Sequence, residues 1–245
     1  MTDLPATILW RDPGLLLLDK PSGLPVLADR SGIPCLWDAL TAYLAEDGLR
    51  PLAVHRIDKG TSGLLMVALE PRTQRALSRA FEEGLVGKWY AAISHGLLPC
   101  GSLDIDLPLA PGRKSRWRIA GPREAIGLDV AASPKRYRLE VEVNDPQAKA
   151  ARTRIRKVSQ NDRHSLFSIR LHTGRTHQIR VHLSWLGAPL LGDHLYGRPG
   201  DPDQSAARLA LHCHRLQWPD LGDGVDRPRT FRSPLPSDFR ALLPA

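Results

Sequence analysis

The chain has few cysteines, and their spacing does not pair them. Cys35, Cys100 and Cys213 are the only three, and no two of them form a CxxC pair. Neither a disulfide framework nor a zinc ribbon is therefore expected, because both need closely spaced or evenly paired thiols. We expect the three thiols to be reduced.

Long apolar runs are also missing. No segment approaches the roughly 18 to 20 apolar residues of a membrane-spanning helix. The first residues, MTDLPATILWRDPG, lack the basic start and the small-residue cleavage site of a signal peptide. We therefore expect a cytoplasmic protein that makes no membrane contact.

The sequence contains no internal repeat, no heptad pattern and no interdomain linker. At 245 residues the chain is long enough to bury a substantial core. The Pro/Gly-containing loops near 108–134 and 197–205 do not amount to a linker. We expect residues 1–245 to form a single domain and the protein to be a monomer.

Basic residues outnumber acidic ones, with 34 Lys and Arg against 26 Asp and Glu, a net charge of +8 and a pI near 9.8. The excess is clustered, because nine Lys or Arg residues but a single acid, Asp162, lie between Lys149 and Arg180. Such clusters favour polyanionic partners, and nucleic acid is the leading one. A solvated basic face without a partner is the alternative.

Apolar periodicity predicts more strands than helices. Strands are predicted on both sides of the Asp12-Pro13-Gly14 turn and at 88–94, 136–143 and 167–171. Helices are predicted at 35–48, 73–84 and 176–187. Because the two kinds of element do not alternate regularly, we expect an α+β fold around a mainly antiparallel mixed sheet flanked by helices, not a doubly wound fold.

A polar cluster, His55-Arg56-Ile57-Asp58-Lys59, precedes an apolar strand at 64–69. Gly60, Thr61, Ser62 and Gly63 follow Asp58, so the aspartate is expected on a tight loop that leads into the strand. Loops held by a rigid sheet are common positions for catalytic groups. A carboxylate that merely caps the turn is the alternative.

The stretch HRIDKGTSGLLMVA (55–68) resembles the signature His-Arg-Leu-Asp-x-x-Thr-Ser-Gly of the RluA-type pseudouridine synthases, with Ile57 in place of the usual Leu. Further segments resemble the family in order and spacing, namely LDKPSGLPV, KWYAAISHG, LHTGRTHQIRVHLSWLGAPLLGDHLYG, RLALHCHRLQW and FRSPLPSDF. The resemblance runs from about Ile8 to Phe239, but residues 113–150 match nothing. It implies a pseudouridine-synthase catalytic domain with a basic active-site cleft and no preceding S4 domain.

The resemblance also implies a reaction and its residues. The chain is expected to isomerise specific uridines of ribosomal or transfer RNA, without a cofactor. Asp58 matches the catalytic aspartate and would act as nucleophile or as base. Arg175 matches the arginine that keeps this carboxylate ionised. Tyr90 matches the tyrosine that stacks on the target uracil, and Leu64 is a candidate for the same pocket.

RNA binding is assigned by the same resemblance and by charge. Arg56 would fill the place that a flipped-out uridine leaves in the stack, whereas a surface salt bridge is the alternative. His55 is placed in the same RNA-binding group, and it is expected to support the loop by hydrogen bonding. The alternative for Arg175 is a phosphate contact, and the alternative for Tyr90 and for Leu64 is core packing. The remaining predicted RNA contacts are Lys88, Arg152, Arg154, His177 and Arg180.

The histidines do not have the spacing of a metal site. His172, His177 and His182 recur every five residues, a step that rotates about 140° on a helix, and Gln178 stands where a zincin would have Glu. We expect no metal. Two rival functions remain at this stage, a non-catalytic RNA-binding or ribosome-assembly protein on the same scaffold and a metal-dependent phosphodiesterase.

Overall fold

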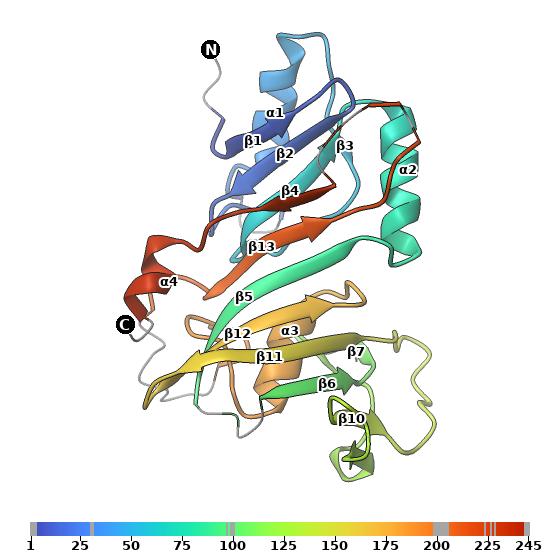
Figure 1. Ribbon diagram of the computed structural model, residues 1–245, viewed down its shortest axis with the longest axis vertical. Coiled ribbons are helices and arrows are strands. Elements are labelled where there is room, and N and C mark those ends of the chain that lie inside the picture. Colours follow the sequence, from blue (N-terminus) through green and yellow to red (C-terminus); the bar gives the residue numbers. More distant parts are fainter. Residues whose placement is uncertain are drawn as a thin grey trace. The chain divides into compact units, whose positions relative to one another are not determined.

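The computed structural model describes residues 4–29, 32–96, 98, 101–197, 206–222, 224–225, 227 and 229–242. The chain divides into two compact units (Figure 1). Unit 1 comprises Met1–Lys88 and His212–Pro234, and unit 2 comprises Trp89–Leu211 and Leu235–Ala245. Each unit therefore joins segments that lie far apart in the sequence.

The sheet of unit 1 has the strand order β1-β2-β4-β13, with β3 paired to β4 and β14 paired to β13. The β4–β13 pair is parallel, and the pairs β1–β2, β2–β4, β3–β4 and β13–β14 are antiparallel. The strands are β1 (Thr7–Arg11), β2 (Leu15–Lys20), β3 (Leu52–Ala53), β4 (Ser62–Ala68), β13 (Leu211–Gln217) and β14 (Thr230–Arg232).

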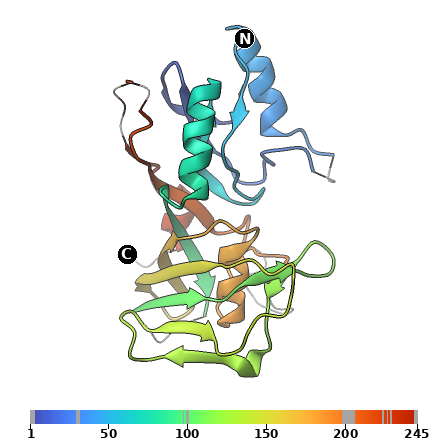
Figure 2. The same ribbon diagram turned by 90° about the vertical axis from the view of Figure 1, so that its right-hand side faces the viewer.

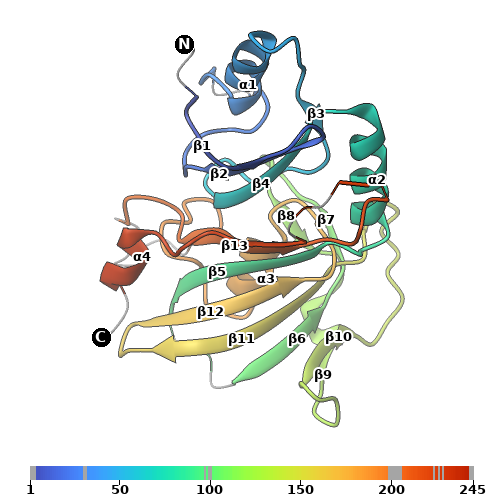
Figure 3. The same ribbon diagram turned by 45° about the horizontal axis from the view of Figure 1, so that its top comes forward.

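Two helices belong to unit 1, α1 (Leu36–Ala45) and α2 (Pro71–Glu82) (Figure 3). The predicted apolar face of α1 is buried, and it packs in one core with β2 and β4 through Leu36, Leu40, Leu44, Leu16, Leu18, Leu65 and Val67. All seven residues of β4 are buried. Strand β4 is thus a fixed element at the centre of the unit, and the loop that carries Asp58 enters it directly.

The strand order in unit 2 is β5-β12-β11-β6-β10-β9, with a separate β7–β8 hairpin. The β6–β10 pair is parallel, and β9–β10, β6–β11 and β11–β12 are antiparallel. The strands are β5 (Gly87–His95), β6 (Ser102–Asp106), β7 (Leu109–Pro111), β8 (Trp117–Ile119), β9 (Ile126–Asp129), β10 (Arg136–Leu139), β11 (Arg152–Gln160) and β12 (His164–Leu171). A short 3-10 helix, Arg123–Ala125, precedes β9.

Helices α3 (Gln178–Trp185) and α4 (Ser237–Leu242) complete unit 2 (Figure 2). Val181 of α3 packs with Leu109 and Ala151, whereas Phe239 of α4 belongs to a core cluster with Ile93 of β5. The mixed, mainly antiparallel sheet with few helices confirms the α+β prediction.

The strand predicted at 136–143 is shorter than expected. Strand β10 ends at Leu139, whose partner Ile126 is the first residue of the four-residue strand β9. Beyond that point Val141 and Val143 are 49% and 37% exposed. The alternation in the sequence continues, but the pairing that makes a strand does not.

Among the described residues, no helix has both the length and the apolar character needed to cross a lipid bilayer. The structure divides into two compact units, and the expectation that residues 1–245 form a single domain stays a prediction.

Candidate active site

The loop that carries Asp58 is fastened by a buried lysine. Lys20, at the end of β2, is fully buried. Its ammonium group donates to three carbonyl oxygens, those of Pro21 (2.7 Å), Leu24 (2.7 Å) and Lys59 (3.2 Å). Because an ammonium group has three donors, these bonds satisfy it. Lys20 thereby ties the Pro21–Leu24 turn to the residue that follows Asp58, a role that the sequence did not suggest.

Further hydrogen bonds join the same two segments. The Ser22 hydroxyl donates to the Gly60 carbonyl at 2.6 Å, and the Gly23 amide donates to the Lys59 carbonyl at 2.9 Å. Within the loop the Thr61 amide donates to the Asp58 carbonyl at 3.0 Å. The loop is therefore held at several main-chain points, which leaves the half-buried Asp58 side chain to be positioned by a stiff backbone.

Replacing Lys20 by Met should destabilise the protein by about 3 kcal/mol, because the carbonyl groups of Pro21 and Leu24 lose the ammonium donor and the Lys59 carbonyl keeps only the Gly23 amide. The loop should also loosen, so the rate at saturating substrate is expected to fall in protein that remains folded. Chemical denaturation of the variant checks the first effect. Lys59→Met is the matched control, since the Lys59 side chain is 35% exposed and its ion pair with Asp29 spans 3.6 Å. Its change should stay within about 1 kcal/mol, and equal losses in both variants would contradict the role of Lys20.

His55 supports the loop from the other side. Its Nε2 atom accepts a hydrogen bond from the Met66 amide of β4 at 2.9 Å, and its ring stacks on Phe81 of α2 with centroids 4.6 Å apart. Burial, and then the positive charge of Lys88, lower the pKa of His55 to about 3. The ring is therefore neutral at neutral pH, as an acceptor must be.

The pKa of His55 predicts how stability depends on pH. In the unfolded chain the ring titrates near its ordinary 6.5, so below that pH the unfolded state binds a proton that the folded state refuses. The contribution is complete above about pH 6.5 and declines by about 1.4 kcal/mol per unit as the pH falls toward 3. Denaturation between about pH 7 and pH 5 should give a slope that is shallower in His55→Gln, whose amide oxygen can still accept, by about this amount, because the contribution of the other buried histidine, His182, is common to both proteins. The same slope in both proteins would refute the lowered pKa of His55.

The other predicted residues of unit 1 occupy different environments. Arg56 is exposed, as insertion into an RNA stack requires. Leu64 is fully buried in β4, the position of a core residue. Lys88 is 8% exposed, and its ammonium group lies 5.6 Å from the centroid of the Phe81 ring. The RNA contact of Lys88 stays a prediction, to which its side chain can offer only a small exposed part.

In unit 2, Tyr90 lies on β5 and is 7% exposed. Arg175 lies in the loop between β12 and α3, where its Nε donates to the Ala150 carbonyl at 2.9 Å. Tyr90 and Arg175 thus belong to unit 2, whereas Asp58 belongs to unit 1.

The Arg175 loop is fastened by Gln178, which is 2% exposed. The Gln178 Oε1 atom accepts from the Arg175 amide (3.0 Å) and the Thr173 hydroxyl (2.7 Å). Its Nε2 atom donates to the Arg152 carbonyl (3.1 Å) and the Thr153 hydroxyl (2.9 Å). Gln178 is the first residue of α3, and its side-chain amide uses all of its hydrogen-bonding groups to join the Arg175 loop to β11. Gln178 is therefore a positioning residue. In the sequence it stood out only because it occupies the position where a zincin would have Glu.

His182 continues this network. Its Nε2 lies 3.0 Å from the Leu107 carbonyl, so Nε2 carries the proton and Nδ1 accepts from the Thr153 hydroxyl at 2.8 Å. Burial lowers the pKa of His182 to about 4, which keeps the ring neutral. The histidine holds α3 against β11, and both of its ring nitrogens are used in hydrogen bonds. Throughout the part of the chain that the structure describes, no group of three His, Cys, Asp or Glu side chains could hold a metal ion.

Two predicted RNA contacts point into unit 2. Arg180 forms a two-pronged ion pair with Asp193 at 2.7 and 2.8 Å, and its side chain is 11% exposed. Burial alone would raise the pKa of Asp193, but the hydrogen bonds and charge of Arg180 outweigh it and lower the pKa. His177 shares a hydrogen bond with the Tyr196 hydroxyl at 2.9 Å. The RNA contacts of Arg180 and His177 stay a prediction, and both side chains already have partners within unit 2.

Arg152 and Arg154 of β11 keep partly exposed side chains, at 35% and 37%. Both bind the buried carboxylate of Asp104 on β6. The basic segment of the sequence is therefore divided, with Arg180 turned inward and the β11 arginines at the surface.

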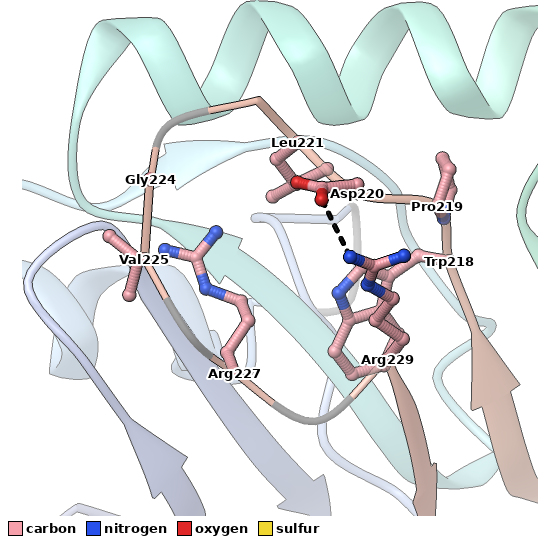
Figure 4. A pocket seen from close by; sticks show the side chains of 8 residues that line it. All are labelled: Trp218, Pro219, Asp220, Leu221, Gly224, Val225, Arg227 and Arg229. Atoms are coloured by element: carbon pink, nitrogen blue, oxygen red, sulfur yellow. Dashed lines mark hydrogen bonds and ion pairs between the residues drawn. The ribbon is translucent and has the colours of Figure 1, made fainter.

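Two surface hollows are lined by residues outside the predicted site. One lies in the β13–β14 loop of unit 1, where Arg229 binds Asp220 at 2.6 Å (Figure 4). The other lies beside α3 in unit 2, where Arg123 lies 5.3 Å from the ring centroid of Trp185. The segment 113–150, which matched no family motif, supplies part of the second hollow.

Comparison with known proteins decides the family. The family model described as RNA pseudouridylate synthase matches residues 14–185. The chain belongs to this family. The RluA-type resemblance is confirmed by relatives, and the protein is an RNA pseudouridine synthase.

The synthase is 36% identical over 245 residues to an uncharacterized RNA pseudouridine synthase of Zymomonas mobilis, covering 99% of both chains. It is 35% identical to ribosomal large subunit pseudouridine synthase D of Nitrosomonas europaea, covering 99% of this chain and 65% of that protein. Among solved structures, human RNA pseudouridylate synthase domain containing 4 superposes with a TM-score of 0.75 at 24% identity, over 95% of this chain and 90% of the other. This last likeness concerns the fold alone.

Proposed function

We propose that Asp58 is the reactive carboxylate of this synthase. The observation that carries the proposal is the stiffness of its loop, which Lys20 and His55 fasten to β2 and β4 while Asp58 remains half-buried and Arg56 exposed. Precise placement of a reactive group can supply much of an enzymatic rate. Arg175 would hold the carboxylate ionised, Tyr90 would stack on the uracil, and Arg56 would fill the vacated place in the RNA.

The chemistry needs one carboxylate and no cofactor. The bond between ribose C1′ and uracil N1 breaks, the base turns, and C1′ joins C5. Asp58 would act as the nucleophile or as the base in this exchange. The hydrogen of C5 then leaves as a proton and N1 ends protonated, so atoms and electrons balance without a redox step. A uridine labelled with tritium at C5 must therefore release its label to water.

For the substrate we propose a stem-loop of large-subunit ribosomal RNA, with transfer RNA as the second class. Support comes from the name of the Nitrosomonas europaea relative, which refers to the large ribosomal subunit. We further propose that the enzyme works as a monomer in the cytoplasm, where these RNAs are found.

Binding to such an RNA should weaken steeply with salt. Lys and Arg side chains that neutralise phosphates release counterions. Each neutralised phosphate adds about 0.7 to 0.9 to the magnitude of the slope of log affinity against log salt. We expect a slope of magnitude about 3 or more for a surface with this excess of arginine. Fluorescence anisotropy with a labelled stem-loop across a potassium chloride series measures it. A nearly flat dependence would contradict an electrostatic RNA site.

The test of the proposed substrate uses tritium release from two sets of transcripts, ribosomal and transfer RNA, each labelled at uridine C5. Release from ribosomal RNA in EDTA supports the proposal and excludes the metal-dependent phosphodiesterase. Release from transfer RNA alone would move the substrate to the second class. RNA binding without release from either set would leave the non-catalytic binding protein as the better description.

A further inference from the structure

One face of the unit 2 sheet carries a set of arginines that the proposed reaction does not use. Alternate residues of a strand point to the same face. The set, called here the arginine face, comprises Arg136 and Arg138 of β10, Arg152, Arg154 and Arg156 of β11, and Arg170 of β12. Arg138, Arg156 and Arg170 are exposed, and the other three are partly exposed.

The strand register brings like charges together on this face. Arg154 lies directly opposite Arg170 in the β11–β12 pair. Like charges in directly opposed positions of a sheet destabilise it. The arrangement is therefore not explained by the stability of the sheet, and it suits a surface whose charge is neutralised by a ligand.

A buried carboxylate fixes part of the arginine face. Asp104 is fully buried, accepts hydrogen bonds from Arg154 at 2.7 and 2.9 Å and from Arg152 at 3.0 Å, and lies 3.7 Å from a nitrogen of Arg136. Burial alone would raise the pKa of Asp104, but the hydrogen bonds of Arg154 and Arg152 and their charges outweigh it and lower the pKa. One negative charge thus orders three guanidinium groups and leaves a positive excess.

The other nearby acids do not cancel this excess. Asp106 faces Arg152 across the β6–β11 pair. Asp129 faces Arg136 across the β9–β10 pair, and its Oδ1 accepts from the amides of Ala131 and Ala132. Glu140 also counts, because its carboxylate lies beside Gly127, the partner of Arg138 in the β9–β10 pair. With Asp104, four carboxylates stand against six guanidinium groups.

An aromatic ring borders the arginine face. The guanidinium carbon of Arg170 lies 5.2 Å from the centroid of the Trp89 ring, and Trp89 is half-buried. Aromatic and guanidinium planes of this kind are the surfaces on which RNA bases stack. The face therefore combines contacts for phosphates with a platform for a base.

The arginine face lies on the opposite side of the sheet from Tyr90. Trp89 and Tyr90 are successive residues of β5, so their side chains point to opposite faces. Likewise, Thr153 between Arg152 and Arg154 points toward α3, where it binds His182 and Gln178. Figure 2 shows the green and yellow strands of unit 2 side by side with the orange helix α3. A uridine stacked on Tyr90 cannot at the same time contact the arginine face.

We propose that the arginine face is a second RNA-binding surface of the synthase, which holds the sugar-phosphate backbone of the substrate RNA on the side of the sheet away from Tyr90. The inference rests on the proposed function in one respect, that the ligand is the substrate RNA. Arginines two residues apart on β11 repeat every 6.8 Å or so, about twice the rise per residue, and guanidinium groups bind phosphate oxygens in pairs. A row of regularly spaced phosphates fits this array better than an irregular acidic protein surface.

The test neutralises two arginines that do not bind Asp104, in the double variant Arg156→Gln/Arg170→Gln. The control Arg75→Gln/Arg79→Gln removes the same charge from the exposed side of α2. For stem-loop RNA at about 0.1 M salt, the first variant should bind about 10- to 30-fold more weakly and its salt slope should fall by about 1.4 to 1.8. The rate at saturating RNA should stay at the parent value, because Tyr90 is not touched, and the melting temperature should not fall, because the like charges of Arg154 and Arg170 no longer face each other.

The outcomes separate this proposal from the proposed function. Weaker binding with an unchanged saturating rate supports the second surface. RNA binding equal to that of the control variant overturns it and leaves an acidic protein partner for the arginine face. If the parent forms no pseudouridine in any RNA, the proposed function fails, and the binding comparison still decides the arginine face by the same criterion.

Discussion

Replacing Asp58 by Asn is expected to lower pseudouridine formation by at least about 10³-fold, the upper part of the range for loss of a positioned acid, base or nucleophile. The amide has nearly the shape of the carboxylate but neither its charge nor its basicity. Because the loop is held through main-chain atoms of Asp58, Lys59 and Gly60, the substitution should leave the backbone in place. Single-turnover tritium release with excess enzyme isolates the chemical step.

The control for this experiment is Asp162→Asn, which removes an exposed carboxylate from the turn between β11 and β12. It should keep the parent rate. Asp58→Asn should bind the same stem-loop with an affinity close to that of the parent. If Asp58→Asn retains more than about a tenth of the parent rate, the reactive group lies elsewhere.

Replacing Gly63 by Ala is expected to destabilise the protein strongly. Gly63 has φ of +104°, and a Cβ atom placed there would lie 2.3 Å from the Cys213 carbonyl oxygen and 2.8 Å from its nitrogen. Gly63 faces Cys213 in the parallel β4–β13 pair, so the obstacle is backbone and cannot turn aside. The strained φ and the displacement of β13 together should cost about 3 kcal/mol or more.

Thermal and chemical denaturation measure this loss, and Gly101→Ala is the matched control. A Cβ atom at Gly101 would meet nothing within 4 Å, and its φ is outside the positive range. We expect the control to change stability by less than about 1 kcal/mol. A Gly63→Ala protein as stable as the control would show that β4 and β13 do not approach as closely as the structure has them.

Gly63 also explains in physical terms why the motif around Asp58 ends in Thr-Ser-Gly. Ser62 binds His212 of β13 through its hydroxyl at 2.9 Å, and Gly63 allows the two backbones to meet. The polar cluster at 55–59 therefore precedes a buried strand because that strand is the fixed support of the loop.

The sequence predicted the elements whose patterns are local. The apolar spacing of α1 and α3 and the alternation in β12 were read correctly, because each depends on residues close together in the chain. The length of β10 was not, because it depends on how far β9 extends as a partner.

The roles of charged residues were harder to predict, since they depend on partners distant in the sequence. Lys20 reads as a solvated lysine, yet one of its acceptors, the Lys59 carbonyl, comes from a loop brought near by the β2–β4 pair. Arg180 reads as part of a basic stripe, but Asp193 folds back on it from beyond α3. Asp104 drew no attention in the sequence, because its importance comes from the arginines of neighbouring strands.

The linear cluster from Lys149 to Arg180 is the clearest case. One-dimensional charge counting treats it as a single RNA-binding stripe, whereas strand alternation places Arg152, Arg154 and Arg156 on one face of β11. Arg175 lies in a separate loop that Gln178 fastens. The surfaces that we propose to bind RNA can be separated only when the sheet is known.

Catalysis by Asp58 is tested by the conversion of uridine to pseudouridine by the purified protein in EDTA, followed on large-subunit ribosomal RNA labelled at uridine C5. Digestion to nucleosides and chromatography count the product, and tritium in water counts the lost C5 hydrogens. We expect equal amounts of pseudouridine and released tritium, formed by the parent and not by Asp58→Asn. Tritium release without pseudouridine, or equal conversion by both proteins, would contradict it.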